Sequence, residues 1–162
     1  MNTATPVTVR VVRHFDAAPE RVFDAWLDPK TAAKFLFATP TGRMVRAEID
    51  ARVDGKFTFV DRRDGEDVEH VGEYLEIDRP RHLVFSFAVP KFSSQRTTAI
   101  IDIAPDGAGC ALTLTHEGVL PDYASRTEHG WGKILDGLAG ALGVPTSAAT
   151  VNGINRIVEY LQ

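Results

Sequence analysis

Histidines are well suited to metal binding and acid–base chemistry, and the sequence has five of them: His14, His70, His82, His116 and His129. None shows the HxxxH or HExxH spacing by which two histidines on one helix face hold zinc. His129 directly precedes Gly130 and Trp131, where it could hydrogen-bond a strand or face a ligand. The spacing therefore predicts neither a metal site nor a cofactor.

Paired carboxylates act as general acid and base only when one of them has a raised pKa. Glu48 and Asp50 lie two residues apart in an alternating segment, so they share one face of a strand. Arg46 and Arg52 lie on that same face and would keep both acids ionised. The pattern therefore favours a solvated ladder of charges over a catalytic pair.

The sequence also gives no support for nucleophilic catalysis. Cys110 follows a glycine-rich turn without a basic neighbour in sequence, so nothing predicts a lowered thiol pKa. The chain has no Gly-x-Ser-x-Gly elbow, no phosphate-cradling loop and no dinucleotide fingerprint. We therefore assign no catalytic residue from sequence motifs.

Apolar side chains carry the stronger functional signal, because aromatic residues alternate along several predicted strands and a leucine stripe follows the last long helix. One interpretation is plain core packing, and the other is the lining of an apolar pocket. Both can hold, since such a pocket is a core that is incompletely filled. The candidate lining residues are Phe35, Phe37, Phe57, Phe59, Tyr74, Phe85, Phe87, His129, Trp131, Leu135 and Leu138.

Glycines are concentrated in that helix, where five of the chain's 13 occupy positions 130, 132, 137, 140 and 143. Each glycine in a helix interior costs about 1 kcal/mol relative to alanine. Close packing on a sheet or space for a ligand beside Trp131 would compensate for this cost. We hypothesise that Gly132 or Gly137 borders a cavity.

Composition limits the class of protein. The chain has 162 residues, 44% hydrophobic and 25% charged, which is typical of one globular domain. Its net charge of -4 argues against a nucleic-acid partner, and one cysteine cannot form an internal disulfide. The sequence shows neither a signal peptide nor an apolar run long enough to span a membrane. We therefore expect a cytoplasmic protein without a membrane partner.

The elements that must position these residues follow from periodicity and turn signals. The spacing predicts a strand at 8–15, followed by two short helices at 19–27 and 28–35. Six antiparallel strands over 44–117, a long helix at 121–143 and a terminal helix at 146–162 are expected after them. Ser125 and Glu128 have the spacing of a capping box for the long helix, and Gly143 is expected to end it. Thr146 or Ser147 is the expected cap of the terminal helix.

Six segments, in this order, resemble the START-like helix-grip (SRPBCC) superfamily, and within it the bacterial relatives of the C-terminal domain of the heat-shock-protein-90 ATPase activator. They are RHFDAAP at Arg13–Pro19, VFDAWLDP at Val22–Pro29, IDARVDG at Ile49–Gly55, GEYLEIDRP at Gly72–Pro80, LVFSF at Leu83–Phe87 and HGW at His129–Trp131. The chain departs from the family at Asp54 and Gly55, where a Gly-Gly pair is usual. The resemblance implies an α+β helix-grip fold, a curved antiparallel sheet wrapped around the long C-terminal helix.

The same resemblance implies the class of ligand that is bound, but it does not imply a reaction. We expect a helix-grip domain over 1–145 that binds an apolar or amphipathic small molecule between sheet and long helix, without catalysing a reaction. The extension 146–162 would pack on this domain, with homodimerisation as the alternative. Two other functions stay open. One is a cyclase- or hydrolase-type enzyme using His14, Glu73, Tyr74 or His129, and the other is a module that stimulates a chaperone ATPase.

Overall fold

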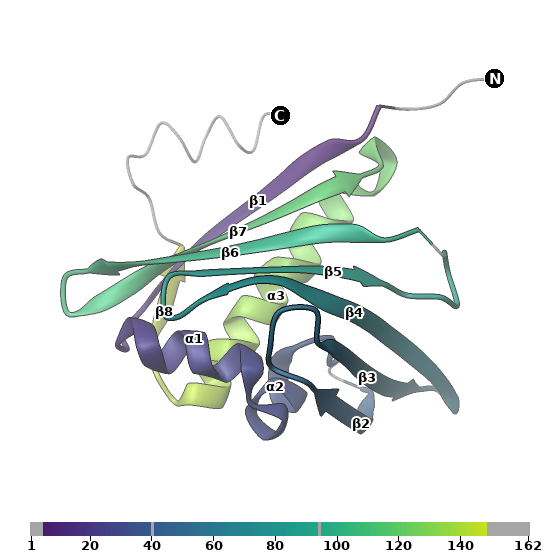
Figure 1. Ribbon diagram of the computed structural model, residues 1–162, viewed down its shortest axis with the longest axis horizontal. Helices are drawn as coiled ribbons and strands as arrows, with labels where there is room; N and C mark the ends of the chain where they lie inside the picture. The colour runs from purple at the N-terminus through teal and green to yellow at the C-terminus, as the bar shows by residue number, and fades with distance from the viewer. Residues whose placement is uncertain (1–4, 40, 94, 149–162) are drawn as a thin grey trace.

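The computed structural model describes residues 5–39, 41–93 and 95–148. Eight strands and three α-helices occur in this part of the chain, together with a short 3₁₀ turn at Pro121–Tyr123 (Figure 1). In chain order they are β1 (Val7–Phe15), α1 (Pro19–Leu27), α2 (Pro29–Phe35), β2 (Arg43–Ile49), β3 (Lys56–Arg63), β4 (Glu66–Asp78), β5 (His82–Ala88), β6 (Thr97–Asp106), β7 (Gly109–Val119), α3 (Ala124–Leu142) and β8 (Thr146–Ala148).

The eight strands form one antiparallel sheet in the order β2-β3-β4-β5-β6-β7-β1-β8. The sheet curves over α3, and α1 and α2 lie against the C-terminal half of that helix (Figure 1). This arrangement buries the apolar face of every central strand, as a one-sided sheet requires. The predicted α+β helix-grip architecture is confirmed.

The two short helices begin as their sequences predict. Pro19 and Pro29 each lie in a first turn, where a missing N–H leaves no hydrogen bond unmade. The Asp28 carboxylate accepts hydrogen bonds from the Lys30 amide and the Thr31 hydroxyl, which confirms its capping role. On α1, the face containing Phe23 and Trp26 is buried and joins the core.

The start of α3 differs from the prediction. Its N-cap is Tyr123, which makes no side-chain capping bond, and the preceding 3₁₀ turn leads directly into the helix. The expected capping box of Ser125 and Glu128 is therefore wrong, because both residues already lie inside the helix. The predicted end is confirmed: Gly143 has φ of 68°, a left-handed conformation that glycine adopts without strain.

The chain after α3 returns to the sheet. Thr146–Ala148 forms β8 and pairs with β1 at Arg13–Phe15. The prediction that a helix begins at Thr146 or Ser147 is therefore wrong. The rest of the predicted terminal helix, 149–162, lies outside the described residues. No helix within the described ranges is both long and apolar enough to cross a bilayer.

Asp54, where the chain departs from the family's usual glycine pair, adopts φ of 68°. A left-handed conformation disfavours most residues with a side chain, but aspartate tolerates it better than bulky residues do. The Asp54 amide donates to the Tyr74 carbonyl, which fastens the β2–β3 turn to β4. The aspartate therefore preserves the turn that glycine would otherwise make.

Candidate functional site

The centre of the space between sheet and α3 is filled with side chains. Most of the predicted lining residues are there, each at most 4% exposed: Phe57, Phe59, Tyr74, Phe85, Trp131, Leu135 and Leu138. Their aromatic rings contact one another edge to face or tilted, for example Phe57 with Phe85 at a centroid distance of 5.6 Å. Open space lies beside the middle of α3, where α2 approaches it, and at the start of α3.

The first open space, which we call the α2–α3 pocket, has a volume of about 590 Å³. Its lining residues are Lys34, Phe35, Phe37, Ala38, Thr39, Arg63, His70, Gly130, Lys133, Ile134 and Gly137. Two of the predicted lining residues, Phe35 and Phe37, therefore border a pocket. Gly137, one of the two glycines proposed to border a cavity, also lines it.

Glycine is what leaves room on the helix side of this pocket. A methyl group at Gly130 would meet nothing within 4 Å, and one at Gly137 would lie 3.3 Å from the Phe35 Cβ atom. Gly132 faces elsewhere, against the Arg13 guanidinium, in a groove that also includes His129 and Asp136. His129 is exposed and so lies apart from the aromatic cluster with which it was grouped.

His70 supplies a polar group on the sheet side of the α2–α3 pocket. Its side chain is on β4, is 5% exposed and stacks on the Phe37 ring at 4.5 Å. The His70 Nδ1 atom has no hydrogen-bond partner among the described residues. Burial, assisted by the nearby Arg63 charge, lowers the His70 pKa to about 4, so the ring is neutral at physiological pH. An unpaired buried nitrogen is costly unless a ligand or water satisfies it.

A buried carboxylate holds the loop that carries Phe37. Asp61 on β3 is 0% exposed, and its Oδ2 accepts from the Thr39 hydroxyl and from Arg63 Nε, both at 2.8 Å. The Arg63 guanidinium also donates to the Phe37 carbonyl. A methyl group on Gly42 would overlap the Asp61 carboxylate, so the loop can approach it this closely only with glycine.

Phe37 itself has φ of 60°, a conformation that is uncommon for a bulky residue. The contacts around Asp61 maintain this strained backbone, and they fix the ring between His70 and the aromatic cluster. Strain of this kind is found more often at functional sites than elsewhere. The wall of the α2–α3 pocket is therefore held in place.

The second open space, which we call the β7–α3 pocket, has a volume of about 850 Å³ and lies where β7 leads into α3. It is lined by Phe92, Ser93, Gln95, Thr97, His116, Gly118, Val119, Leu120, Tyr123, Arg126 and Thr127. The partly buried Phe87, another predicted lining residue, packs against His116 and Trp131. Its ring therefore lies between the β7–α3 pocket and the core.

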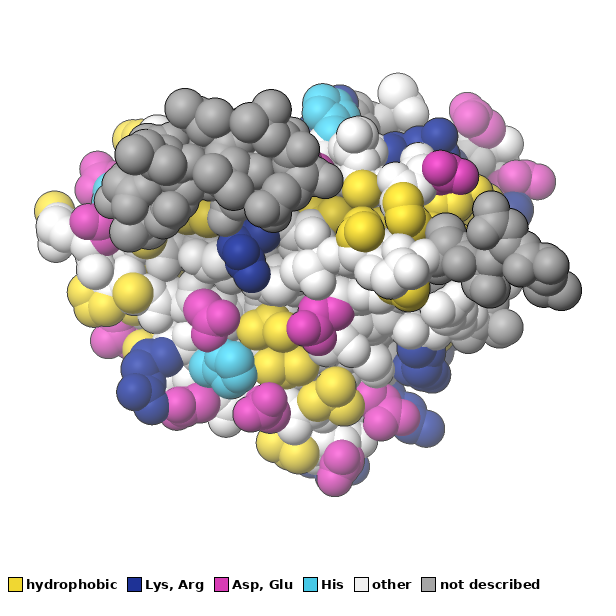
Figure 2. All heavy atoms as spheres, turned by 90° about the horizontal axis from the view of Figure 1, so that it is seen from above, with side chains coloured by type: hydrophobic (Ala, Val, Ile, Leu, Met, Phe, Trp, Pro, Cys, Tyr) yellow, Lys and Arg dark blue, Asp and Glu magenta, His cyan; other side chains and the backbone are white. Residues whose placement is uncertain are grey.

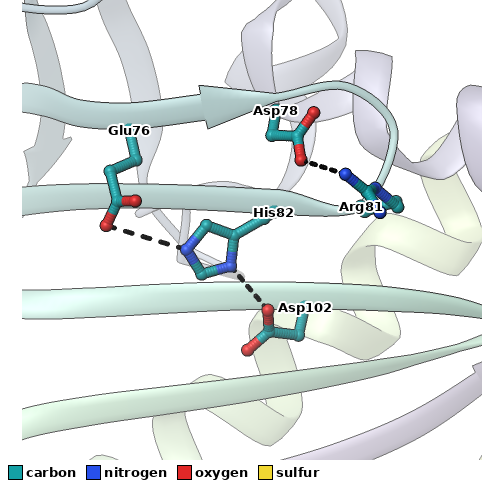
Figure 3. Close-up of polar contacts among 5 residues, drawn as sticks. All are labelled: Glu76, Asp78, Arg81, His82 and Asp102. Atoms are coloured by element: carbon teal, nitrogen blue, oxygen red, sulfur yellow. Dashed lines mark hydrogen bonds and ion pairs between the residues drawn. The ribbon is translucent and has the colours of Figure 1, made fainter.

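The sheet face opposite α3 carries ion pairs (Figures 2 and 3). The His82 Nδ1 atom donates to Asp102 at 2.6 Å, its Nε2 lies 3.7 Å from Glu76, and the Asp102 hydrogen bond raises the His82 pKa. The predicted carboxylate ladder is confirmed as two pairs, Arg46 with Glu48 and Arg52 with Asp50.

The residues considered for enzymatic chemistry do not converge on one site. Glu73 and Tyr74 are neighbours on β4, so their side chains point to opposite faces of the sheet. His14 on β1 donates to the Asp106 carbonyl, while Tyr74 on β4 is in the core, where burial raises its pKa. Cys110 is buried, and burial raises its thiol pKa to about 11, which makes it a poor nucleophile at neutral pH. Within the described residues, no group of three or more His, Cys, Asp or Glu side chains could hold a metal ion.

Comparisons with known proteins identify the relatives of this architecture. A sequence model of the family described as "Activator of Hsp90 ATPase homolog 1-like protein" matches residues 16–143. Protein CV1439 from Chromobacterium violaceum is 28% identical with a TM-score of 0.75, over 82% of this chain and 94% of that one.

More distant structures share the fold. SA2116 from Staphylococcus aureus, a protein of unknown function, is 15% identical with a TM-score of 0.77, over 86% of this chain and 95% of that one. PFC0360w, an HSP90 activator from Plasmodium falciparum, is 22% identical with a TM-score of 0.67, over 86% of this chain and 99% of that one. No curated protein matches the chain.

Proposed function

This chain belongs to the family of activator of Hsp90 ATPase homolog 1-like proteins, and from that premise we propose that it binds an amphipathic small molecule in the α2–α3 pocket. The observation that carries the proposal is the α2–α3 pocket itself, whose largely apolar wall includes the buried, neutral His70 side chain. Ligand pockets characteristically combine apolar walls with a few polar groups that fix orientation.

The apolar part of the ligand would lie against Phe35, Phe37 and Ile134. Each methylene group buried there contributes about 0.8 kcal/mol before the costs of association. The rings are already fixed by the surrounding core, so little conformational entropy is lost when a chain packs on them. This favours an aliphatic chain over a polar solute.

The polar end of the ligand would be anionic. Lys34, Arg63 and Lys133 line the pocket, and no described lining residue is acidic. Arg63 is paired with Asp61, which leaves the two lysines as the main source of positive potential. A carboxylate near the lysines would gain a modest, salt-sensitive attraction.

The test is a calorimetric titration with decanoate, an anionic ten-carbon chain, against a matched pair of variants. Gly130→Leu places a side chain in the pocket, and Gly140→Leu places the same side chain elsewhere on α3, where a Cβ also meets nothing within 4 Å. Both changes favour helix formation, so neither should unfold the domain.

We expect saturable one-site binding by the wild type and by Gly140→Leu, and a loss of at least about tenfold in affinity for Gly130→Leu. Decanoate that fails to bind, or that binds equally well to both variants, would contradict the proposal. Higher salt should weaken binding only modestly, because the apolar chain contributes most of the free energy.

A second candidate function is stimulation of a chaperone ATPase. Two observations support it: the family to which the chain belongs, and a core whose centre is filled with side chains. In addition, the charged outer face of the sheet offers ion-pairing groups to a protein partner (Figure 2). The measurement is ATP hydrolysis by a purified Hsp90 with and without this chain. Stimulation that persists in Gly130→Leu would assign this activity to a surface other than the α2–α3 pocket.

A further inference from the structure

The β7–α3 pocket is at the start of α3, where the β5–β6 connection contributes Phe92, Ser93 and Gln95 to its lining, whereas the pocket proposed above borders the middle of the helix. The two pockets share no lining residue. Between them lie the packed rings of Phe37, Phe87 and Trp131, with centroids 5.3 to 6.3 Å apart. The two pockets are therefore separate candidate binding sites.

Three polar side chains form a directed chain of hydrogen bonds from the core to this pocket. The Trp131 indole N–H donates to His116 Nδ1 at 3.0 Å, and His116 Nε2 lies 2.7 Å from the Thr97 hydroxyl. An indole nitrogen only donates, so His116 Nδ1 must be an acceptor and carries no proton. The imidazole proton is therefore on Nε2, which donates to Thr97 Oγ1.

The direction of these hydrogen bonds leaves the Thr97 hydroxyl hydrogen unused. Because Thr97 Oγ1 accepts from His116, its own hydrogen takes no part in that bond and can be donated elsewhere. Thr97 is half-buried and lines the pocket, as does the 6% exposed His116. Successive donors polarise one another, which strengthens the last donor of such a chain.

We propose that the β7–α3 pocket binds a small apolar molecule through an acceptor oxygen, a carbonyl or a carboxylate, that takes the Thr97 hydroxyl hydrogen. The pocket presents the apolar surface that the body of such a molecule needs. Five large apolar side chains are exposed among the described residues, and three of them, Phe92, Leu120 and Tyr123, line this pocket. Clustering of exposed apolar groups marks a binding surface.

Arg126 distinguishes the two kinds of acceptor. Its guanidinium lies 5.4 Å from the centre of the Tyr123 ring, and no described lining residue of the pocket is acidic. A carboxylate would be attracted by this charge as well as by the hydroxyl, whereas a neutral carbonyl would depend on the hydroxyl alone. The proposal therefore predicts separate effects of substitutions at Thr97 and Arg126.

The test uses three probes of one shape: benzoate, acetophenone and α-methylstyrene, in which a methylene group replaces the ketone oxygen of acetophenone. Binding is followed by NMR through the Gly118 amide and the Trp131 indole N–H, one of two such indole signals from the two tryptophans. The alkene is more hydrophobic than the ketone, so the ratio of the two affinities is the readout, rather than either value.

Thr97→Val removes the hydroxyl with little change of shape. We expect it to shift the affinity ratio by about tenfold against acetophenone. Thr98→Val, on the opposite face of the same strand, should leave the ratio unchanged. Thr97→Ser keeps the hydroxyl and should restore the wild-type ratio. Arg126→Gln should weaken benzoate several-fold and leave acetophenone unaffected.

The expected signature of the hydroxyl contact is a shift of the Trp131 indole signal with acetophenone that α-methylstyrene does not produce. An unchanged affinity ratio in Thr97→Val would overturn the proposal. So would binding of benzoate without binding of acetophenone, because charge alone would then determine recognition. Absence of binding by all three probes would also overturn it.

Discussion

Two buried neutral histidines make the stability of this protein depend on pH in a defined window. His70 and His116 are 5% and 6% exposed, and burial lowers the pKa of each from 6.5 to about 4. An unfolded chain takes up a proton at each histidine as the pH falls below 6.5, whereas the folded chain does so only near pH 4. The free energy of unfolding therefore falls as the pH is lowered through this window, and it keeps its full value above the window.

The size of the effect follows from the two shifts. One pKa unit corresponds to about 1.4 kcal/mol, so each histidine contributes about 3 kcal/mol at neutral pH that is lost by pH 4. With both histidines, the free energy of unfolding should fall by about 2.7 kcal/mol per pH unit in the middle of the window. His82 acts in the opposite direction, because Asp102 raises its pKa, and its contribution is lost as the pH rises.

The assay is urea unfolding between about pH 7.5 and pH 5, above the range in which most carboxylates titrate. His70→Phe keeps the stacking on Phe37, and His116→Gln keeps an acceptor for Trp131 and a donor for Thr97. Each variant should remove about half of the slope, and the double variant nearly all of it. A slope in the double variant equal to that of the wild type would refute the reasoning.

Three further predictions concern individual contacts. Asp102→Asn should bring the His82 pKa back toward 6.5, because the negative charge of the Asp102 carboxylate, which favours the protonated ring, is removed. An NMR titration that still gives the wild-type pKa would show that another group raises it. Gly72→Ala should destabilise the fold by about 1–3 kcal/mol in urea unfolding, since its methyl group would overlap a carbonyl oxygen of β5; a neutral effect would disprove this overlap. Arg63→Met should cost about 3–5 kcal/mol, since it leaves the fully buried Asp61 without its cation, and Asp61→Asn in the same chain should recover part of that loss.

Periodicity and turn signals predict the order of the elements, and the family resemblance predicts how they assemble into a sheet around the long helix. Alternation defined the six central strands, and Asp28 and Gly143 marked helix ends through local hydrogen bonding and backbone conformation, which depend on few neighbours. The three-residue strand β8 carries too short a pattern to be recognised, and its pairing with β1 is a long-range contact. The start of α3 is determined by the 3₁₀ turn that precedes it and not by a capping side chain.

The polar groups of both pockets, His70 and His116, could have been predicted from sequence, because each continues the alternation of buried residues along its strand. His70 has the same parity as the buried Val68 and Tyr74, and His116 has the same parity as the buried Leu112 and Leu114. A histidine on the core face of a strand must find a partner or remain neutral. Both histidines border an open space because of how the neighbouring rings pack, and the sequence pattern does not contain that information.

The central claim is that the α2–α3 pocket binds an amphipathic molecule, and intermolecular NOEs from bound decanoate test it most directly. The account predicts contacts from the aliphatic chain to the Ile134 methyl groups and to the Phe35 and Phe37 rings, and from the methylenes beside the carboxylate to Lys34 or Lys133. Contacts confined to other surfaces, or no contacts at saturating decanoate, would contradict it.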